Sequence, residues 1–231
     1  TTDFNYGGAT TFCVGGTNPI ATITGDSSGL FTATGGLVID SLTGEIDLST
    51  ATVGNYQVTY TPPSNWQQIG ADIDGEAVGD YSGSVSMNAA GDRLAIGATL
   101  NDGNGLDAGH VRIYDWSGTA WTQIGQDIDG EAAGDRSGIS VSMNAAGDRL
   151  AIGAFYNDGN GFDAGHLRIY EWNGSTWTQL GQDINGESAG DESGFLSVSI
   201  NAAGDRVAIG AYRNDGNGID AGHVRIYDWN G

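Results

Sequence analysis

Short alternations of apolar and polar residues run along this chain, and they predict strands rather than helices. The clearest run is Gly54–Tyr60, in which Tyr56, Val58 and Tyr60 share one face. Residues 1–61 therefore predict a small Ig-like β-sandwich. Other apolar positions that we expect in its strands are Phe12 and Val14, Ile20 and Ile23, Leu37 and Ile39, and Ile46 and Leu48.

A stiff linker is expected over residues 62–65, because Pro62 and Pro63 offer no N–H to a strand ladder. From Trp66 the sequence repeats with a period of about 55 residues, which is typical of solenoids, propellers and arrays. The predicted units are about 66–120, 121–176 and 177–231. Equivalent positions include Trp66, Trp121 and Trp177, Asp92, Asp148 and Asp205, and His110, His166 and His223.

Each unit contains four strand-like runs, the number found in a propeller blade. In the middle unit the third run is apolar on both faces, so we expect it between neighbouring sheets, and we expect the fourth nearer the rim. The runs are Trp121–Ile128, Ile139–Met143, Arg149–Ala154 and His166–Trp172.

The ends of the array are predicted to be incomplete. The run Trp66–Ile73 lacks three predecessors, and the last three runs lack a fourth. Propellers normally have about four to eight blades, and open sheet edges favour association. We therefore expect completion by further repeats of the same parent chain or by other copies of the protein.

The composition of the chain excludes some classes of binding partner. The chain has 40 glycines and 3 prolines, and its 29 acidic against 8 basic residues give a net charge of -21. Such a field repels phosphate backbones and anionic lipids, so we expect neither nucleic-acid binding nor direct membrane insertion. Cys13 has no internal disulfide partner and is expected to be a small buried apolar residue. Neither a span of about 20 apolar residues nor a leader is evident.

Three copies of Gly-Asp-x-Ser-Gly, each followed later by an Ile-Gly-Ala run, resemble the FG-GAP family. This is the blade repeat of integrin α-subunit propellers and of many bacterial surface proteins, and the resemblance covers residues 65–231. It implies propeller-type four-stranded blades. Calcium-binding members carry an Asp-rich loop where this chain has Asn88–Arg93, which keeps too few oxygen ligands for calcium.

Residues 1–61 are similar to a sandwich repeat of giant surface adhesins in gliding Bacteroidetes. The similarity is carried by Phe12-Cys13, Asn18-Pro19, Ile23-Thr-Gly25, Gly44–Ser49 and Gly54–Thr61. It implies export, a place on the outer cell surface and no catalysis.

Metal binding is predicted at a glycine-rich loop that offers closely spaced amide and carboxylate oxygens, although the same residue types also suit a tight turn. Calcium is the ion that we expect there. The candidate ligands are Asn101, Asp102, Asn104 and Asp107, then Asn157, Asp158, Asn160 and Asp163, then Asn214, Asp215, Asn217 and Asp220.

A second loop rich in carboxylate oxygens is an equally good candidate for metal binding. It contains Asp72, Asp74, Glu76 and Asp80, repeated as Asp127, Asp129, Glu131 and Asp135. We expect Arg93, Arg149 and Arg206 to pair with these carboxylates.

Each group of residues that could act in catalysis, a histidine or a pair of carboxylates, recurs in the repeat units, whereas an enzyme has one active site. The histidines are therefore expected to be structural. The tryptophans either pack between blades, which we favour, or form a sugar-stacking surface.

The sequence predicts an all-β, non-enzymatic extracellular segment of a large bacterial surface protein, acting as a stalk or recognition module. Two alternatives are a self-assembling filament or matrix protein and a carbohydrate-binding propeller. The ligands expected for recognition are a surface polysaccharide or a protein.

Overall fold

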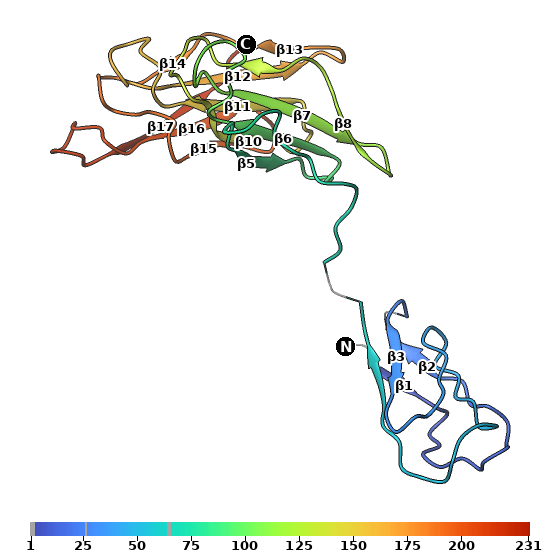
Figure 1. Ribbon diagram of the computed structural model, residues 1–231. Coiled ribbons are helices and arrows are strands. Elements are labelled where there is room, and N and C mark those ends of the chain that lie inside the picture. The colour runs from blue at the N-terminus through green and yellow to red at the C-terminus, as the bar shows by residue number, and fades with distance from the viewer. Residues whose placement is uncertain (1–2, 26, 64–65) are drawn as a thin grey trace. The chain divides into compact units, whose positions relative to one another are not determined.

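The computed structural model describes residues 3–25, 27–63 and 66–231, and these residues form strands and turns without a helix (Figure 1). The all-β prediction is confirmed. The chain divides into two compact units, residues 1–68 and 69–231. Half of the predicted linker, residues 64–65, lies outside the described residues.

The first unit contains two small antiparallel sheets. Strand β1 (Asp3–Asn5) pairs with β2 (Thr22–Thr24), and β3 (Leu30–Ala33) pairs with β4 (Val58–Thr61). The predicted Gly54–Tyr60 strand is therefore formed only in its second half. Buried Phe31 lies at the centre, with its ring 5.3 Å from that of Phe4 and 4.8 Å from that of Tyr60.

Several predictions for this unit are wrong. Of the four pairs of apolar positions expected in strands, only Ile23 lies in a named strand, and Ile39 and Ile46 form an isolated bridge. The others lie in no described strand, and three of them are exposed: Phe12, Val14 and Ile20. Cys13 is also exposed, because its carbonyl accepts the Gly16 N–H in a surface turn.

The second unit consists of three antiparallel sheets. The first has the order β5-β6-β7-β8 with β9 also on β7, the second β10-β11-β12-β13 with β14 on β12, and the third β15-β16-β17. The bounds are β5 Ser82–Met87, β6 Arg93–Ala98, β7 His110–Trp116, β8 Trp121–Gln123, β9 Ile128–Asp129, β10 Ser137–Met143, β11 Arg149–Ala154, β12 His166–Trp172, β13 Trp177–Gln179, β14 Ile184–Asn185, β15 Val198–Ile200, β16 Arg206–Ala211 and β17 His223–Asp228.

Each sheet is out of phase with the sequence unit by one strand. The run that opens one unit completes the sheet of the unit before it, with Trp116 paired to Trp121 and Trp172 to Trp177. The prediction of one strand over Trp121–Ile128 is wrong, because the run forms two short strands, β8 and β9, that both pair with β7. The run Trp66–Ile73 is not a strand, so that part of the prediction is wrong. A strand needs a neighbour, and no three-stranded sheet precedes this run among the residues described in the second unit.

Successive sheets approach closely at glycine. A Cβ on Gly97 of β6 would lie 2.0 Å from the Gly138 carbonyl oxygen of the next sheet, so only glycine fits. Hydrogen bonds also cross between sheets: the Met143 N–H donates to Ser86 Oγ at 2.9 Å, and Ile200 N–H to Ser142 Oγ at 3.1 Å. The repeated Ile-Gly-Ala and Val-Ser motifs therefore allow one sheet to dock on the next.

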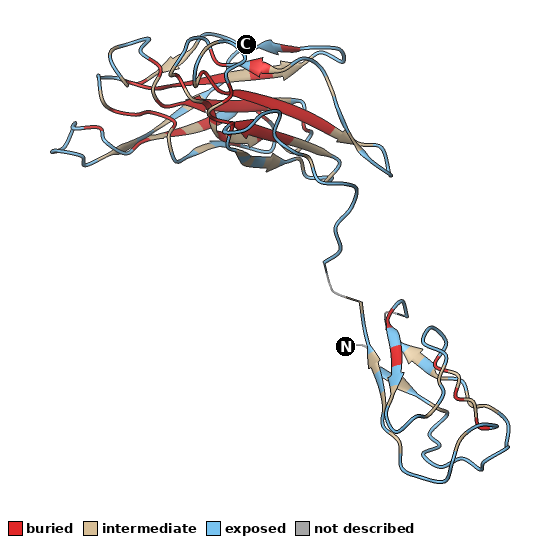
Figure 2. Ribbon diagram, viewed as in Figure 1, coloured by how far each residue is buried: buried red, intermediate tan, exposed pale blue. Residues whose placement is uncertain are grey.

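The core lies between the sheets (Figure 2). The third run of the middle unit, β11, is buried on both faces from Leu150 to Ala154, as predicted. The fourth, β12, is more buried than a rim strand, because β13 and β14 cover its outer edge and His166 and Leu167 are fully enclosed.

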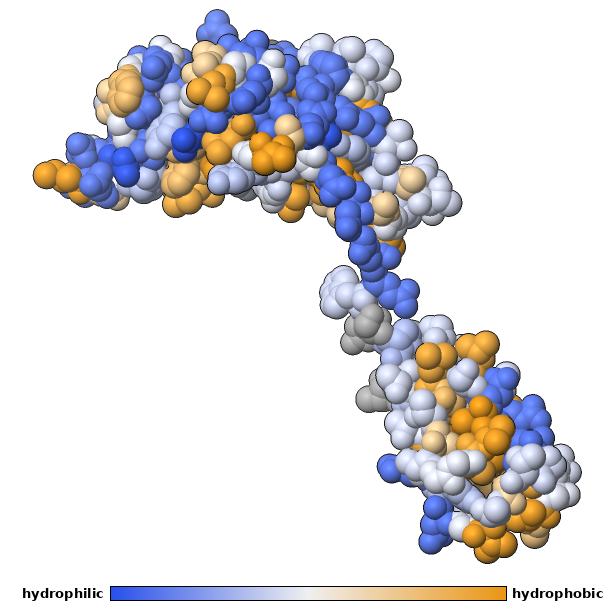
Figure 3. All heavy atoms as spheres, viewed as in Figure 1, coloured by the Kyte–Doolittle hydropathy of each residue, from blue (hydrophilic) through white to orange (hydrophobic). Residues whose placement is uncertain are grey.

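On the face of the second unit seen in Figure 3, apolar residues form small separate patches among polar ones. The described part of the chain contains no helix of the length and apolarity that crossing a bilayer requires.

Candidate functional site

A charged cluster recurs on each sheet, where the third strand meets the acidic loop that precedes the sheet. Arg168 on β12 donates from Nη2 to the Asp129 carbonyl oxygen at 2.8 Å, and its Nη1 lies 3.6 Å from Glu131 Oε1. Arg112 makes the same contacts with Asp74 and Glu76, and Arg225 with Asn185 and Glu187. Each arginine therefore ties its sheet to the acidic loop that precedes the sheet in the chain.

A histidine lies two residues before each of these arginines. His110 and His166 are both 1% exposed, which agrees with the expected structural role. His166 Nδ1 is 3.8 Å from Glu131 Oε2, too far for a hydrogen bond. Burial, reinforced by Arg168, lowers the pKa of His166 to about 4, so the imidazole is neutral at neutral pH.

The predicted pairing of Arg93, Arg149 and Arg206 with the acidic loops is wrong. Arg93 instead binds Asp115 with two hydrogen bonds of 2.6 and 2.8 Å, and it donates to the Gly147 carbonyl oxygen of the next sheet. Arg149 pairs with Glu171, and Arg206 with Asp228. Antiparallel pairing places these partners side by side, because Arg93 is opposite Asp115 in the β6–β7 register.

The predicted calcium loops are closed by internal hydrogen bonds. In the first loop Asn101 Oδ1 accepts the Gly103 N–H, Asp102 Oδ1 accepts the Asp107 N–H, and Asn104 donates to the Gly130 carbonyl. The second loop repeats the same bonds with Asn157, Asp158, Asn160 and Asp163. In the third, Asn214 and Asp215 accept backbone N–H groups in the same way.

These loops nevertheless face the acidic loops across open hollows. One hollow of about 490 Å³ is lined by Glu131, Asp135, Asp158 and Asp163. Burial and the neighbouring Asp158 raise the pKa of Asp163. Calcium at the Asn-Asp-Gly loops stays a prediction.

The tryptophans differ between the two boundaries of the sheets. At the first, Trp177 is 3% exposed and packs on Trp172, and a Cβ on Gly125 would lie 2.8 Å from Trp172 and 3.0 Å from Trp177. The packing expected for these tryptophans is confirmed. At the second boundary Gly181 meets Trp229 in the same way, but no second tryptophan from the described residues is near it.

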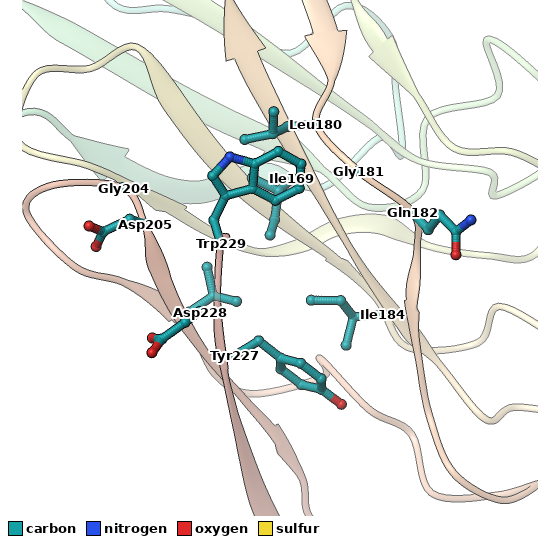
Figure 4. Close-up of a pocket in the computed structure, with 11 residues that line it drawn as sticks. Ile169, Leu180, Gly181, Gln182, Ile184, Gly204, Asp205, Tyr227, Asp228 and Trp229 are labelled. Atoms are coloured by element: carbon teal, nitrogen blue, oxygen red, sulfur yellow. The ribbon is translucent and has the colours of Figure 1, made fainter. Parts of the chain in front are cut away.

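A cavity of about 160 Å³ lies at the second boundary (Figure 4). Its lining includes Ile169, Leu180 and Ile184 from one side, with Tyr227 and Trp229 of the third sheet on the other. Trp229 is 40% exposed there. The cavity therefore lies beside the edge of β17 that corresponds to the edges occupied by β8 and β13.

One grouping of side chains was not predicted from the sequence. Glu131 and Asp183 belong to different repeat units, yet both carboxylates reach His166, and Glu76 and Asp127 reach His110 in the same way. The histidine that recurs in each repeat unit was the feature of the sequence that could have indicated this grouping. Comparison with known proteins returns no family that matches the chain and no curated protein similar to it in sequence.

Proposed function

We propose that this chain is a non-enzymatic extracellular segment of a bacterial surface protein, in which an Ig-like unit precedes propeller-type blades that serve as a stalk or recognition module. The repeated contact between sheets supports this proposal best. Each potentially reactive histidine and carboxylate recurs in similar surroundings, and at the second and third sheets those surroundings join one sheet to the one before it. The resemblance to FG-GAP repeats and surface adhesins supports the extracellular location.

The array grows by strand addition. Its acceptor is the outer edge of β17, and its donor is the Trp66–Asp74 segment of another copy or an equivalent segment of further repeats. Two observations support this: β8 and β13 occupy the corresponding edges of β7 and β12, and the cavity beside Trp229 lies next to the edge that a tryptophan-led strand would pair with. Trp66 is 92% exposed and opens the same sequence pattern as Trp121 and Trp177.

Light scattering over a concentration series tests the strand exchange. We expect the mass to rise above that of the monomer, and Trp66→Ala or Trp229→Ala to abolish the rise. Phe162→Ala is a matched control, because Phe162 is 73% exposed but lies in the Asn-Asp-Gly loop. A strict monomer, or association that persists in both tryptophan variants, would refute strand addition.

The absence of catalysis is tested separately. Screening with glycosidase, esterase and peptidase substrates should reveal no turnover. Activity that disappears when one histidine alone is replaced would overturn the proposal.

Carbohydrate binding is the second candidate, because the aromatic side chains of Tyr227 and Trp229 line the cavity in Figure 4. Aromatic faces suit a sugar ring. Binding of an oligosaccharide that Trp229→Ala abolishes in the monomer would favour this function over strand addition.

A further inference from the structure

Two equivalent clusters of metal-ligand side chains lie at the first two sheets of the second unit. The first combines Glu76, His110 and Asp127, and the second Glu131, His166 and Asp183. In each cluster the potential ligand atoms all lie within 4.8 Å of one another. The glutamate comes from the loop before the sheet, the histidine begins the sheet's third strand, and the aspartate lies just before the short last strand. Three segments distant in sequence thus place one ligand each.

The histidines provide an independent indication of a ligand. His166 is 1% exposed, and neither ring nitrogen has a hydrogen-bond partner among the described residues. A buried polar atom without a partner is costly, so native proteins rarely leave one. His166 Nδ1 nevertheless points at Glu131 Oε2 across 3.8 Å, and His110 Nδ1 is 3.9 Å from both Glu76 Oε2 and Asp127 Oδ2.

These distances between histidine nitrogen and carboxylate oxygen are too long for hydrogen bonds and fit ligands of one shared ion better. Zinc binds histidine nitrogen and carboxylate oxygen at about 2.0–2.2 Å, which separates two tetrahedral ligands by roughly 3.3–3.5 Å. The histidine–carboxylate separations of 3.8–3.9 Å exceed this by about half an ångström, and the widest separations, within 4.8 Å, exceed it by up to about 1.5 Å. Side-chain rotation over these distances would place the ligands of each cluster around one ion. We propose that the Glu76–His110–Asp127 and Glu131–His166–Asp183 clusters are two equivalent binding sites for a divalent transition-metal ion such as Zn²⁺.

The orientation of the glutamates fits this assignment. Arg112 Nη1 lies 3.4 Å from Glu76 Oε1, and Arg168 Nη1 lies 3.6 Å from Glu131 Oε1. The second oxygen of each carboxylate, Oε2, is the one turned toward the histidine. An imidazole with two carboxylates favours zinc, cobalt, nickel or manganese over calcium, which prefers ligands that are all oxygen. Three protein ligands leave a coordination position for water.

An ion in the second cluster would connect two neighbouring sheets. Glu131 follows β9 of the first sheet, whereas His166 and Asp183 belong to the second. The third sheet has only part of this set, with His223 Nδ1 3.5 Å from Glu187 Oε2. If strands are added as proposed above, Asp72 of the added segment corresponds to Asp127 and Asp183 and would supply the third ligand. The two complete sites do not depend on strand addition.

Calorimetric titration of the metal-stripped 231-residue chain with ZnCl₂ tests the assignment, at a physiological salt concentration that screens diffuse binding to the acidic surface. At a concentration where light scattering shows a monomer, we expect two Zn²⁺ per chain. Asp127→Asn and Asp183→Asn should each remove one ion, and the double variant both. The loss in affinity should exceed the roughly 10–100-fold that removal of a mere outer-shell partner costs. These aspartates are partly exposed, so their replacement spares the core.

Asp102→Asn and Asp158→Asn are matched controls, because they remove carboxylates from the Asn-Asp-Gly loops and should leave both zinc ions bound. A shift of the His110 and His166 ring nitrogens in NMR spectra on zinc addition would identify the ligands directly. Absence of zinc binding, or binding unchanged in the Asp127 and Asp183 variants, would overturn the assignment. Light scattering in metal-free buffer keeps the test of strand addition separate.

Discussion

Replacing Trp177 by alanine removes the side chain that closes the boundary between the first two sheets. A buried aromatic side chain hides about 150–250 Å², worth roughly 4–6 kcal/mol at 25 cal/mol per Å². The indole N–H of Trp177 has no hydrogen-bond partner among the residues described, and an unpaired buried donor costs about 1–3 kcal/mol. The difference predicts that Trp177→Ala lowers the free energy of unfolding by about 3 kcal/mol.

Two further variants distinguish the stability that comes from burial of the Trp177 side chain from any effect of simply replacing a tryptophan. Trp177→Phe keeps an aromatic ring and removes the unpaired donor, so it should cost less than about 1.5 kcal/mol. Trp66→Ala changes an equivalent sequence position that is 92% exposed, and at high dilution it should alter stability by less than about 0.5 kcal/mol.

Urea unfolding followed by tryptophan fluorescence measures these effects, because all six tryptophans lie within residues 66–231. Equal losses for Trp66→Ala and Trp177→Ala would refute the reasoning. A larger loss for Trp177→Phe than for Trp177→Ala would also refute it, since the phenylalanine retains more of the buried surface.

Two further predictions concern the contacts between sheets. Gly97→Ala should lower the free energy of unfolding in urea by at least about 2 kcal/mol, because its Cβ would lie 2.0 Å from the Gly138 carbonyl oxygen. Gly83→Ala is the control, because no atom lies within 4 Å of its Cβ. Equal losses for the two variants would contradict the predicted clash. His166 takes up a proton more readily unfolded, at a pKa near 6.5, than folded, at about 4. Its contribution of about 3 kcal/mol is therefore complete above pH 6.5 and is lost as the pH falls to about 4. In metal-free buffer, the urea midpoints of the wild type and His166→Gln should converge over that interval, and parallel pH profiles would contradict the assignment.

The sequence by itself determined the third and fourth strands of the middle repeat unit, whereas the first predicted run, Trp121–Ile128, forms two short strands. Alternation and β-propensity are local properties, so the runs Arg149–Ala154 and His166–Trp172 are found at their predicted bounds. Apolar residues on both faces of the third run were enough to predict its burial between sheets. The first unit was less predictable, because its short turn-rich segments leave Phe12 and Val14 exposed.

Only the tertiary structure decided what equivalent residues do. Trp66 and Trp177 occupy the same place in the repeat, yet one is exposed and the other buried, because a strand acquires its environment from the sheet edge beside it. The partners of the arginines were equally unpredictable from local pattern. Arg93 pairs with Asp115 through the cross-strand register, and Arg112 pairs with Glu76 because the preceding loop packs on the first sheet. The convergence of Glu131, His166 and Asp183 likewise depends on sheets docking through glycine contacts, a distance relation between segments that no local pattern encodes.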